Sequence, residues 1–96
     1  MDKQQVLDSI NAQRERLDEF AVEALFLFGS VARDEATSES DVDFLVKFTR
    51  PVGLFTLLQL KSFLEELLNC SVDVGTPNSL HPHVREAVLK EAIRAV

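Results

Sequence analysis

Hydrophobic positions change their spacing several times along the 96-residue chain. From about Asp2 to Phe20, apolar residues recur every three or four positions with charged and amide residues between them, which predicts an amphipathic helix. Three shorter apolar or alternating runs, Ala24–Phe28, Val42–Phe48 and Ser71–Gly75, end at or shortly before a glycine. Runs of this length with such punctuation predict strands.

The segments between these strands predict helices and one loop. Ser30 to about Asp34 is long enough for one or two helical turns, and Asp34–Ser40 is polar and predicts a loop. Leu54–Leu68 is strongly apolar at helical spacing, and Pro82–Ala95 predicts a last helix with its proline near the first turn. The predicted order is therefore helix, strand, short helix, strand, helix, strand, helix.

This order predicts an α/β (α+β) domain with a small mixed sheet, of three strands or slightly more, backed by helices. We find no internal repeat, low-complexity tract or domain boundary, so residues 1–96 are expected to form a single domain. No segment approaches the roughly 20 apolar residues that cross a bilayer, and we expect no membrane association.

Composition narrows the classes of partner. The chain is 46% hydrophobic and 27% charged, which is ordinary for a globular protein, and its formal net charge is −6. Because phosphate backbones favour basic surfaces, we expect no general nucleic-acid binding. A nucleotide can still bind, because divalent cations bridge carboxylates to phosphates.

The number of cysteines and the sequence of the N-terminus indicate the cellular compartment in which the protein is expected. Cys70 is the single cysteine, so an internal disulfide is excluded, and it is interpreted as a small buried apolar residue rather than a catalytic thiol. The first residues contain no apolar run of the signal-peptide kind. We therefore expect a cytoplasmic protein.

A glycine and a serine directly follow the first predicted strand. Gly29 would let the backbone approach a ligand closely, and the start of the next helix would offer free N–H groups to a phosphate. Ser30 adds a hydroxyl group. The same pair also occurs as ordinary punctuation between a strand and a turn, so the pattern needs support from other residues.

Two aspartates lie at the start of the second predicted strand. Asp41 and Asp43 are two positions apart, which places both carboxylates on one face, roughly 6–7 Å apart along the chain. Like charges side by side are unfavourable unless a cation joins them, and hard divalent cations prefer carboxylate oxygens. Alternatively, Asp41 is a turn residue and Asp43 faces solvent from an edge strand.

A third aspartate lies between two valines of the last predicted strand. An unpaired charge at Asp73 would be costly in an apolar environment. Together with Asp41 and Asp43 it could hold two Mg²⁺ about 3.5–4 Å apart, as in an in-line phosphoryl displacement. The alternative is that Asp73 pairs with an arginine such as Arg33.

Other catalytic and metal-binding motifs do not match. The chain has no Gly-Lys-Ser/Thr of a Walker loop and no Gly-x-Ser-x-Gly of a nucleophile elbow. Counting from Asp41, Val46 and Val52 occupy the loop positions where an EF-hand needs Gly and Glu. His81 and His83 have no cysteine pair nearby, so a zinc site is not expected.

These residues resemble a known signature. A Gly-Ser pair, ten residues and then Asp-Val-Asp is similar to the signature of the polymerase-β-type nucleotidyltransferase superfamily. The longer strings Phe28–Arg33 and Ser40–Asp43 resemble the stand-alone minimal nucleotidyltransferases of bacteria and archaea, and the resemblance extends to the closing helix around Arg85–Ala92. It implies the nucleotidyltransferase fold.

The resemblance also implies a role for each residue. Gly29 and Ser30 would contact the triphosphate of ATP or another nucleoside triphosphate. Asp41 and Asp43 would bind the metals, with two Mg²⁺ ions expected, and Asp73 would be the third catalytic and metal-binding carboxylate, which helps to activate the acceptor hydroxyl.

Two positions near this signature carry further expectations. Arg33 matches a basic position of the family, where it either steadies the phosphates or pairs with an acid. Asp34 departs from the glycine that family members often carry there. Aspartate tolerates a left-handed conformation better than most residues, but its charge would lower nucleotide affinity.

The resemblance finally implies a partner. Minimal nucleotidyltransferases are often encoded beside a small all-helical HEPN protein and act as the antitoxin of a toxin–antitoxin pair by adenylylating a tyrosine of the toxin. This chain has no Tyr, so such an acceptor would belong to another molecule. A homo-oligomer is compatible with this expectation.

Three functional hypotheses follow. The first is an enzyme that transfers AMP, or another nucleoside monophosphate, to a hydroxyl of a protein. The second is a non-catalytic module of the same fold that neutralises a partner by contact, which the apolar Leu54–Leu68 segment motivates. The third is a transferase acting on a small molecule such as an aminoglycoside, which the short chain disfavours because such enzymes usually carry an acceptor-binding domain.

Overall fold

The computed structural model describes residues 2–33, 35, 41–76 and 82–96. The helices are α1 (Lys3–Ala12), α2 (Arg14–Glu19), α3 (Gly29–Ala32), α4 (Leu54–Leu68) and α5 (Pro82–Glu91). The strands are β1 (Val22–Phe28), β2 (Val42–Phe48), β3 (Val72–Gly75) and β4 (Ile93–Arg94). None of these helices combines the length and the hydropathy that a bilayer-crossing segment requires.

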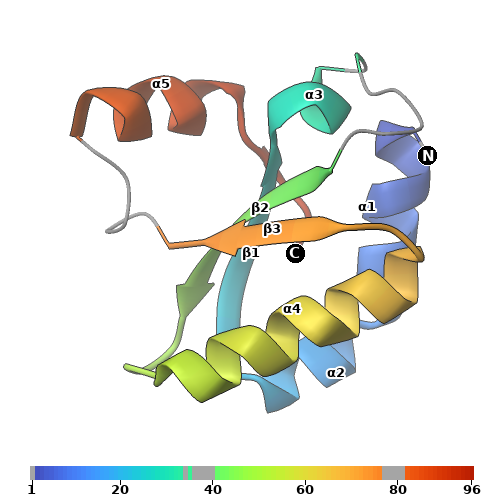
Figure 1. Cartoon of the computed structure of the whole chain (residues 1–96), viewed down its shortest axis with the longest axis vertical. Coiled ribbons are helices and arrows are strands. Elements are labelled where there is room, and N and C mark those ends of the chain that lie inside the picture. Colours follow the sequence, from blue (N-terminus) through green and yellow to red (C-terminus); the bar gives the residue numbers. More distant parts are fainter. Residues whose placement is uncertain (1, 34, 36–40, 77–81) are drawn as a thin grey trace.

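The strands form one mixed sheet in the order β3-β2-β1-β4 (Figure 1). β1 pairs antiparallel with both β2 and β4, whereas β2 pairs parallel with β3. The parallel connection is made by α4, the 15-residue helix between β2 and β3. The sequence prediction of a small mixed sheet backed by helices is therefore confirmed, with four strands.

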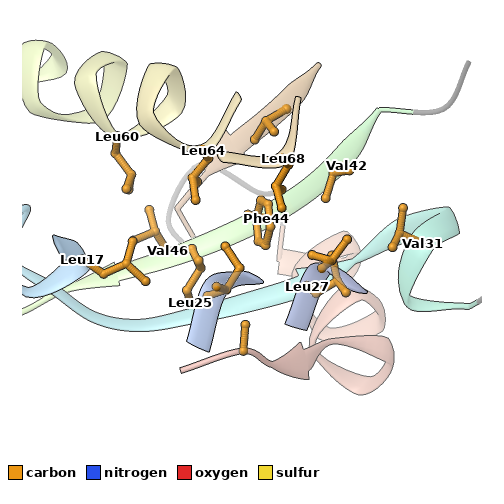
Figure 2. Close-up of a cluster of buried hydrophobic side chains, with 14 of the residues drawn as sticks. Leu17, Leu25, Leu27, Val31, Val42, Phe44, Val46, Leu60, Leu64 and Leu68 are labelled. Atoms are coloured by element: carbon orange, nitrogen blue, oxygen red, sulfur yellow. The ribbon is translucent and has the colours of Figure 1, made fainter. Parts of the chain in front are cut away.

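The main core lies between α4 and one face of the sheet (Figure 2). Leu60, Leu64 and Leu68 follow one another at four-residue spacing on α4, and all three are fully buried against Phe44 and Val46 of β2. The same core includes residues of α1, α2 and β1. The α4 boundaries agree with the sequence prediction, because here the apolar period is long and unbroken.

The N-terminal helix is divided, contrary to the prediction of one helix from Asp2 to Phe20. Gln13 ends α1 and precedes α2, with φ −112° and ψ 24°, outside helical geometry. The break reorients α2, so that Leu17 is buried and the Phe20 ring lies 5.5 Å from the Phe63 ring of α4. Tertiary packing here overrides a continuous helical pattern.

The C-terminal helix is shorter than predicted. α5 ends at Glu91 rather than Ala95, and Ile93–Arg94 pair with Phe26 and Leu27 of β1 instead. The amide of Ala95 then donates a 2.7 Å hydrogen bond to the Leu25 carbonyl. This short strand covers what would otherwise be an open edge of β1.

Candidate functional site

The turn after β1 is built around a glycine in a left-handed conformation. Gly29 has φ +78°, which residues with a Cβ adopt only at a cost. A Cβ at Gly29 would also collide with the Oδ2 atom of Asp43 and lie 3.2 Å from its Cγ. Both the backbone conformation and the close approach of Asp43 therefore require glycine at this position.

The sheet register brings Asp43 and Asp73 side by side. In β2, Asp43 is opposite Phe28 of antiparallel β1 and opposite Asp73 of parallel β3. Neighbouring strands are about 4.8 Å apart, so the two aspartates occupy adjacent positions in one row, next to the Gly29 turn. The sequence placed these carboxylates on neighbouring strands, and the register confirms that placement.

The environments of these two aspartates differ from the sequence interpretation. Asp43 is half-buried on an interior strand, so the alternative that it faces solvent from an edge strand is wrong. Asp73 is exposed on the edge strand β3, so the argument that its charge suffers in an apolar environment is wrong. Flanking valines do not bury Asp73, because alternate residues of a strand point to opposite faces.

Asp41 immediately precedes β2 and is exposed. The amide of Val42 donates a 3.0 Å hydrogen bond to the Ser71 carbonyl, which ties the start of β2 to the start of β3. Asp41 is two residues before Asp43, and its charge acts on the Asp43 carboxylate. The three aspartates are thus electrostatically coupled around Asp43.

Burial is the first reason that the pKa of Asp43 is raised above its ordinary value. The negative charges of Asp73 and then Asp41 raise this pKa further, whereas the positive charge of Arg33 lowers it. Each effect has the expected sign, because desolvation and like charges disfavour a carboxylate and an opposite charge favours it. A cation beside Asp43 would relieve both unfavourable effects.

The donor chemistry of these residues fits a divalent metal. Three carboxylates supply the oxygen ligands that Mg²⁺ prefers. Within the described ranges, however, no three acidic, histidine or cysteine side chains already form a ligand cluster. Like-charged carboxylates repel one another, and a cation bound between them would offset this repulsion.

Arg33 ends the short helix that follows Gly29, and its guanidinium pairs with two acids. Its Nε donates to Glu35 Oε2 at 3.0 Å, and its Nη1 donates to Glu91 Oε2 at 3.1 Å. These ion pairs raise the pKa of Arg33. Of the two roles expected for Arg33, pairing with an acid is confirmed, but the suggested Asp73 is not its partner.

Comparison with known proteins decides the family. The sequence model of the nucleotidyltransferase domain matches residues 10–95. The chain belongs to the nucleotidyltransferase domain family. The resemblance noted in the Gly-Ser and Asp-Val-Asp signature is thereby confirmed, and the chain is an enzyme of this class.

The nucleotidyltransferase has archaeal relatives of similar length. It is 36% identical over 81 residues to the protein adenylyltransferase MntA of Thermococcus cleftensis, covering 84% of this chain and 82% of that one. It is 35% identical over 82 residues to a candidate protein adenylyltransferase of Methanocaldococcus jannaschii, covering 84% of each chain.

Solved structures share its fold. A candidate minimal nucleotidyltransferase, 38% identical, superposes with a TM-score of 0.85 over 97% of this chain and 95% of that one. A chain of an MntA–HepT toxin–antitoxin structure, only 18% identical, superposes with a TM-score of 0.68 over 97% of this chain and 71% of that one, which shows the shared fold.

The sequence of this nucleotidyltransferase did not indicate the two partners of Arg33. Glu91 is 58 residues from Arg33, and they meet because β4, which was not predicted, returns the chain to β1. Glu35 falls in a segment interpreted only as a loop. The sequence signal for Glu35 was its negative charge, two residues from the positive charge of Arg33. No residue near Arg33 in the sequence indicated a contact with Glu91.

The remaining sequence predictions concern residues other than the three aspartates and Arg33. Asp34 and His81 lie outside the described residues, as does most of the predicted loop 34–40. Cys70 is half-buried, and burial raises the pKa of its thiol, which makes the reactive thiolate scarcer. This agrees with the interpretation of Cys70 as a structural residue.

Proposed function

We propose that this nucleotidyltransferase transfers AMP from ATP to a hydroxyl group of a protein partner, using Mg²⁺, in the cytoplasm. The observation that carries the proposal is the convergence of the Gly29 turn with Asp43 and its strand neighbour Asp73. Relatives named protein adenylyltransferases support the choice of AMP and of a protein acceptor. ATP would place its triphosphate at the Gly29–Ser30 turn.

The three aspartates would have different roles in the reaction. Asp41, Asp43 and Asp73 would hold two Mg²⁺ ions, which when bound neutralise the triphosphate and stabilise the leaving pyrophosphate. Half-buried Asp43 would be the ligand nearest the turn. Exposed Asp73, on an edge strand, is accessible to an incoming acceptor, and its carboxylate would take the proton from the attacking hydroxyl oxygen.

The acceptor would belong to another molecule. The chain contains no Tyr, so a tyrosine acceptor cannot be its own. Structures of MntA–HepT toxin–antitoxin complexes share the fold, and one contains a tri-AMPylated HEPN toxin with an MNT antitoxin. A small helical HEPN protein is therefore the partner that we propose, with this chain as the antitoxin.

Transfer of label from ATP tests this function. With Mg²⁺ and a HEPN partner, ATP labelled at the α-phosphate should label the partner, whereas ATP labelled at the γ-phosphate should not. Asp43→Asn should reduce labelling by at least about 100-fold, while Asp18→Asn, an exposed carboxylate on α2, should not. Equal labelling by wild type and Asp43→Asn would reject the assignment of the site.

A second function, neutralisation by contact alone, is favoured by one surface. Leu54, Phe55 and Leu58 on the first turns of α4 are 70%, 73% and 51% exposed. Phe55 and Leu58 line a groove of about 460 Å³ with Phe20 and Phe63. If Asp43→Asn still silences the toxin but Phe55→Asp does not, contact rather than adenylylation accounts for neutralisation.

A further inference from the structure

The guanidinium group of Arg33 is held by carboxylates from two separate elements. Glu35 follows α3 by three residues, whereas Glu91 is the last residue of α5. Both accept hydrogen bonds from Arg33, through Nε and Nη1, at 3.0 and 3.1 Å. These bonds use Nε and Nη1, and the third nitrogen of a guanidinium, Nη2, is a further donor.

The position of Glu91 is fixed by the sheet. Antiparallel β1 and β4 pair Leu27 with Ile93, and Glu91 is only two residues before Ile93 in the chain. Beyond β4, buried Ala95 donates its amide hydrogen to the Leu25 carbonyl. The strand that ends in the Gly29 turn therefore also anchors the segment that carries Glu91.

Arg33 is tied to the same turn through its backbone. Its amide donates a 3.2 Å hydrogen bond to the Gly29 carbonyl, so its Cα follows the turn closely. Its long side chain would otherwise sample many rotamers, because it is 43% exposed. The positive charge of Arg33 already acts on Asp43, which shows that the side chain lies within electrostatic range of the site.

We propose that Glu91 is a positioning residue, whose carboxylate holds Arg33 so that its guanidinium meets the triphosphate at the Gly29–Ser30 turn. This role rests on the proposed function, because it presupposes a nucleotide at that turn. A planar guanidinium that is already oriented loses less freedom on binding phosphate than a mobile one. Glu35 is only two residues from Arg33 in sequence, whereas Glu91 connects Arg33 to a distant part of the chain that is anchored to the sheet.

A double-mutant cycle tests this role. The dissociation constant of Mg²⁺–ATP would be measured by calorimetry for wild type, Glu91→Gln, Arg33→Ala and the double variant. Glu86→Gln, an exposed glutamate on the same helix, is the matched control. Glu91→Gln should weaken binding about two- to fivefold, the range expected for a partly exposed ion pair.

The double variant separates positioning from structural support. If Glu91 acts through Arg33, Glu91→Gln should have no further effect in the Arg33→Ala background, and Glu86→Gln should have none in any background. Unchanged or tighter ATP binding in Glu91→Gln would overturn the role, as would equal weakening in both backgrounds. If wild type binds no nucleotide, the proposed function fails and this role with it, whereas wild-type binding that is indifferent to Glu91 rejects this role alone.

Discussion

The Asp43 carboxylate occupies the space that a side chain at Gly29 would need. A Cβ there would lie 3.2 Å from Asp43 Cγ and still closer to Oδ2. This contact joins the turn after β1 to the first residues of β2, although the two are 14 positions apart in sequence. The pairing of Phe28 with Asp43 fixes the relationship through the backbone.

Gly29→Ala should therefore damage both stability and activity. The substitution forces a Cβ into a left-handed backbone and against Asp43, which should cost about 1–3 kcal/mol in the free energy of unfolding. Urea denaturation measures this loss. Gly53→Ala is the control, because a Cβ at Gly53 meets nothing within 4 Å and only a favourable N-cap residue of α4 is lost, so its cost should stay below about 1 kcal/mol. Equal costs for the two variants would contradict the close approach.

Asp43→Asn should stabilise the protein in the absence of divalent metal. The pKa of Asp43 is raised in the folded state, so the folded protein binds this proton more tightly than the unfolded chain does. The stability of wild type should accordingly fall as pH rises from the ordinary pKa of an unfolded aspartate through the raised pKa of Asp43. Above the raised pKa, wild type carries a destabilising charge at Asp43 that Asp43→Asn lacks. The variant should therefore unfold at a higher temperature than wild type.

Thermal unfolding in EDTA, recorded between pH 4 and pH 8, checks this sign. Asp18→Asn, which removes an exposed carboxylate elsewhere, controls for the change in net charge. A lower unfolding temperature for Asp43→Asn than for wild type at neutral pH would show that the ionised carboxylate is favoured by the fold. Activity should be lost in the same variant, as expected where a site retains a destabilising group for function.

Two leucines of α4 should respond to the same substitution with losses of very different size. Leu64 is fully buried in the core between α4 and the sheet, so Leu64→Ala should cost about 2–5 kcal/mol in the free energy of unfolding. Leu58 is 51% exposed, and Leu58→Ala should cost less than about 1 kcal/mol. Chemical denaturation distinguishes them, and comparable losses would contradict the orientation of this helix.

The sequence predicted the parts of this protein that depend on local pattern. The apolar period of Leu54–Leu68 is long enough to define α4, and the spacing of Asp41 and Asp43 indicated two carboxylates where the second strand begins. The family resemblance depended on these same residues and was confirmed by comparison. Local signals were sufficient because each feature lies within one element.

Features that depend on distant pairing were not predictable in the same way. β4 has two residues and is defined by its pairing with β1, so its sequence alone resembled a continuing helix. The contact of Glu91 with Arg33 follows from that strand. The exposure of Asp73 depends on β3 lying at the edge of the sheet, which the order of elements did not determine.

The central claim is that three carboxylates beside the Gly29–Ser30 turn hold the metals and the nucleotide. A crystal structure with Mn²⁺ and a non-hydrolysable ATP analogue, with the metal located by its anomalous scattering, tests this claim most directly. We expect manganese within about 2–2.5 Å of the Asp41 and Asp43 carboxylates, with Asp73 adjacent and the triphosphate at the turn. Metal bound elsewhere, or Asp43 outside its coordination sphere with the analogue present, would contradict the account.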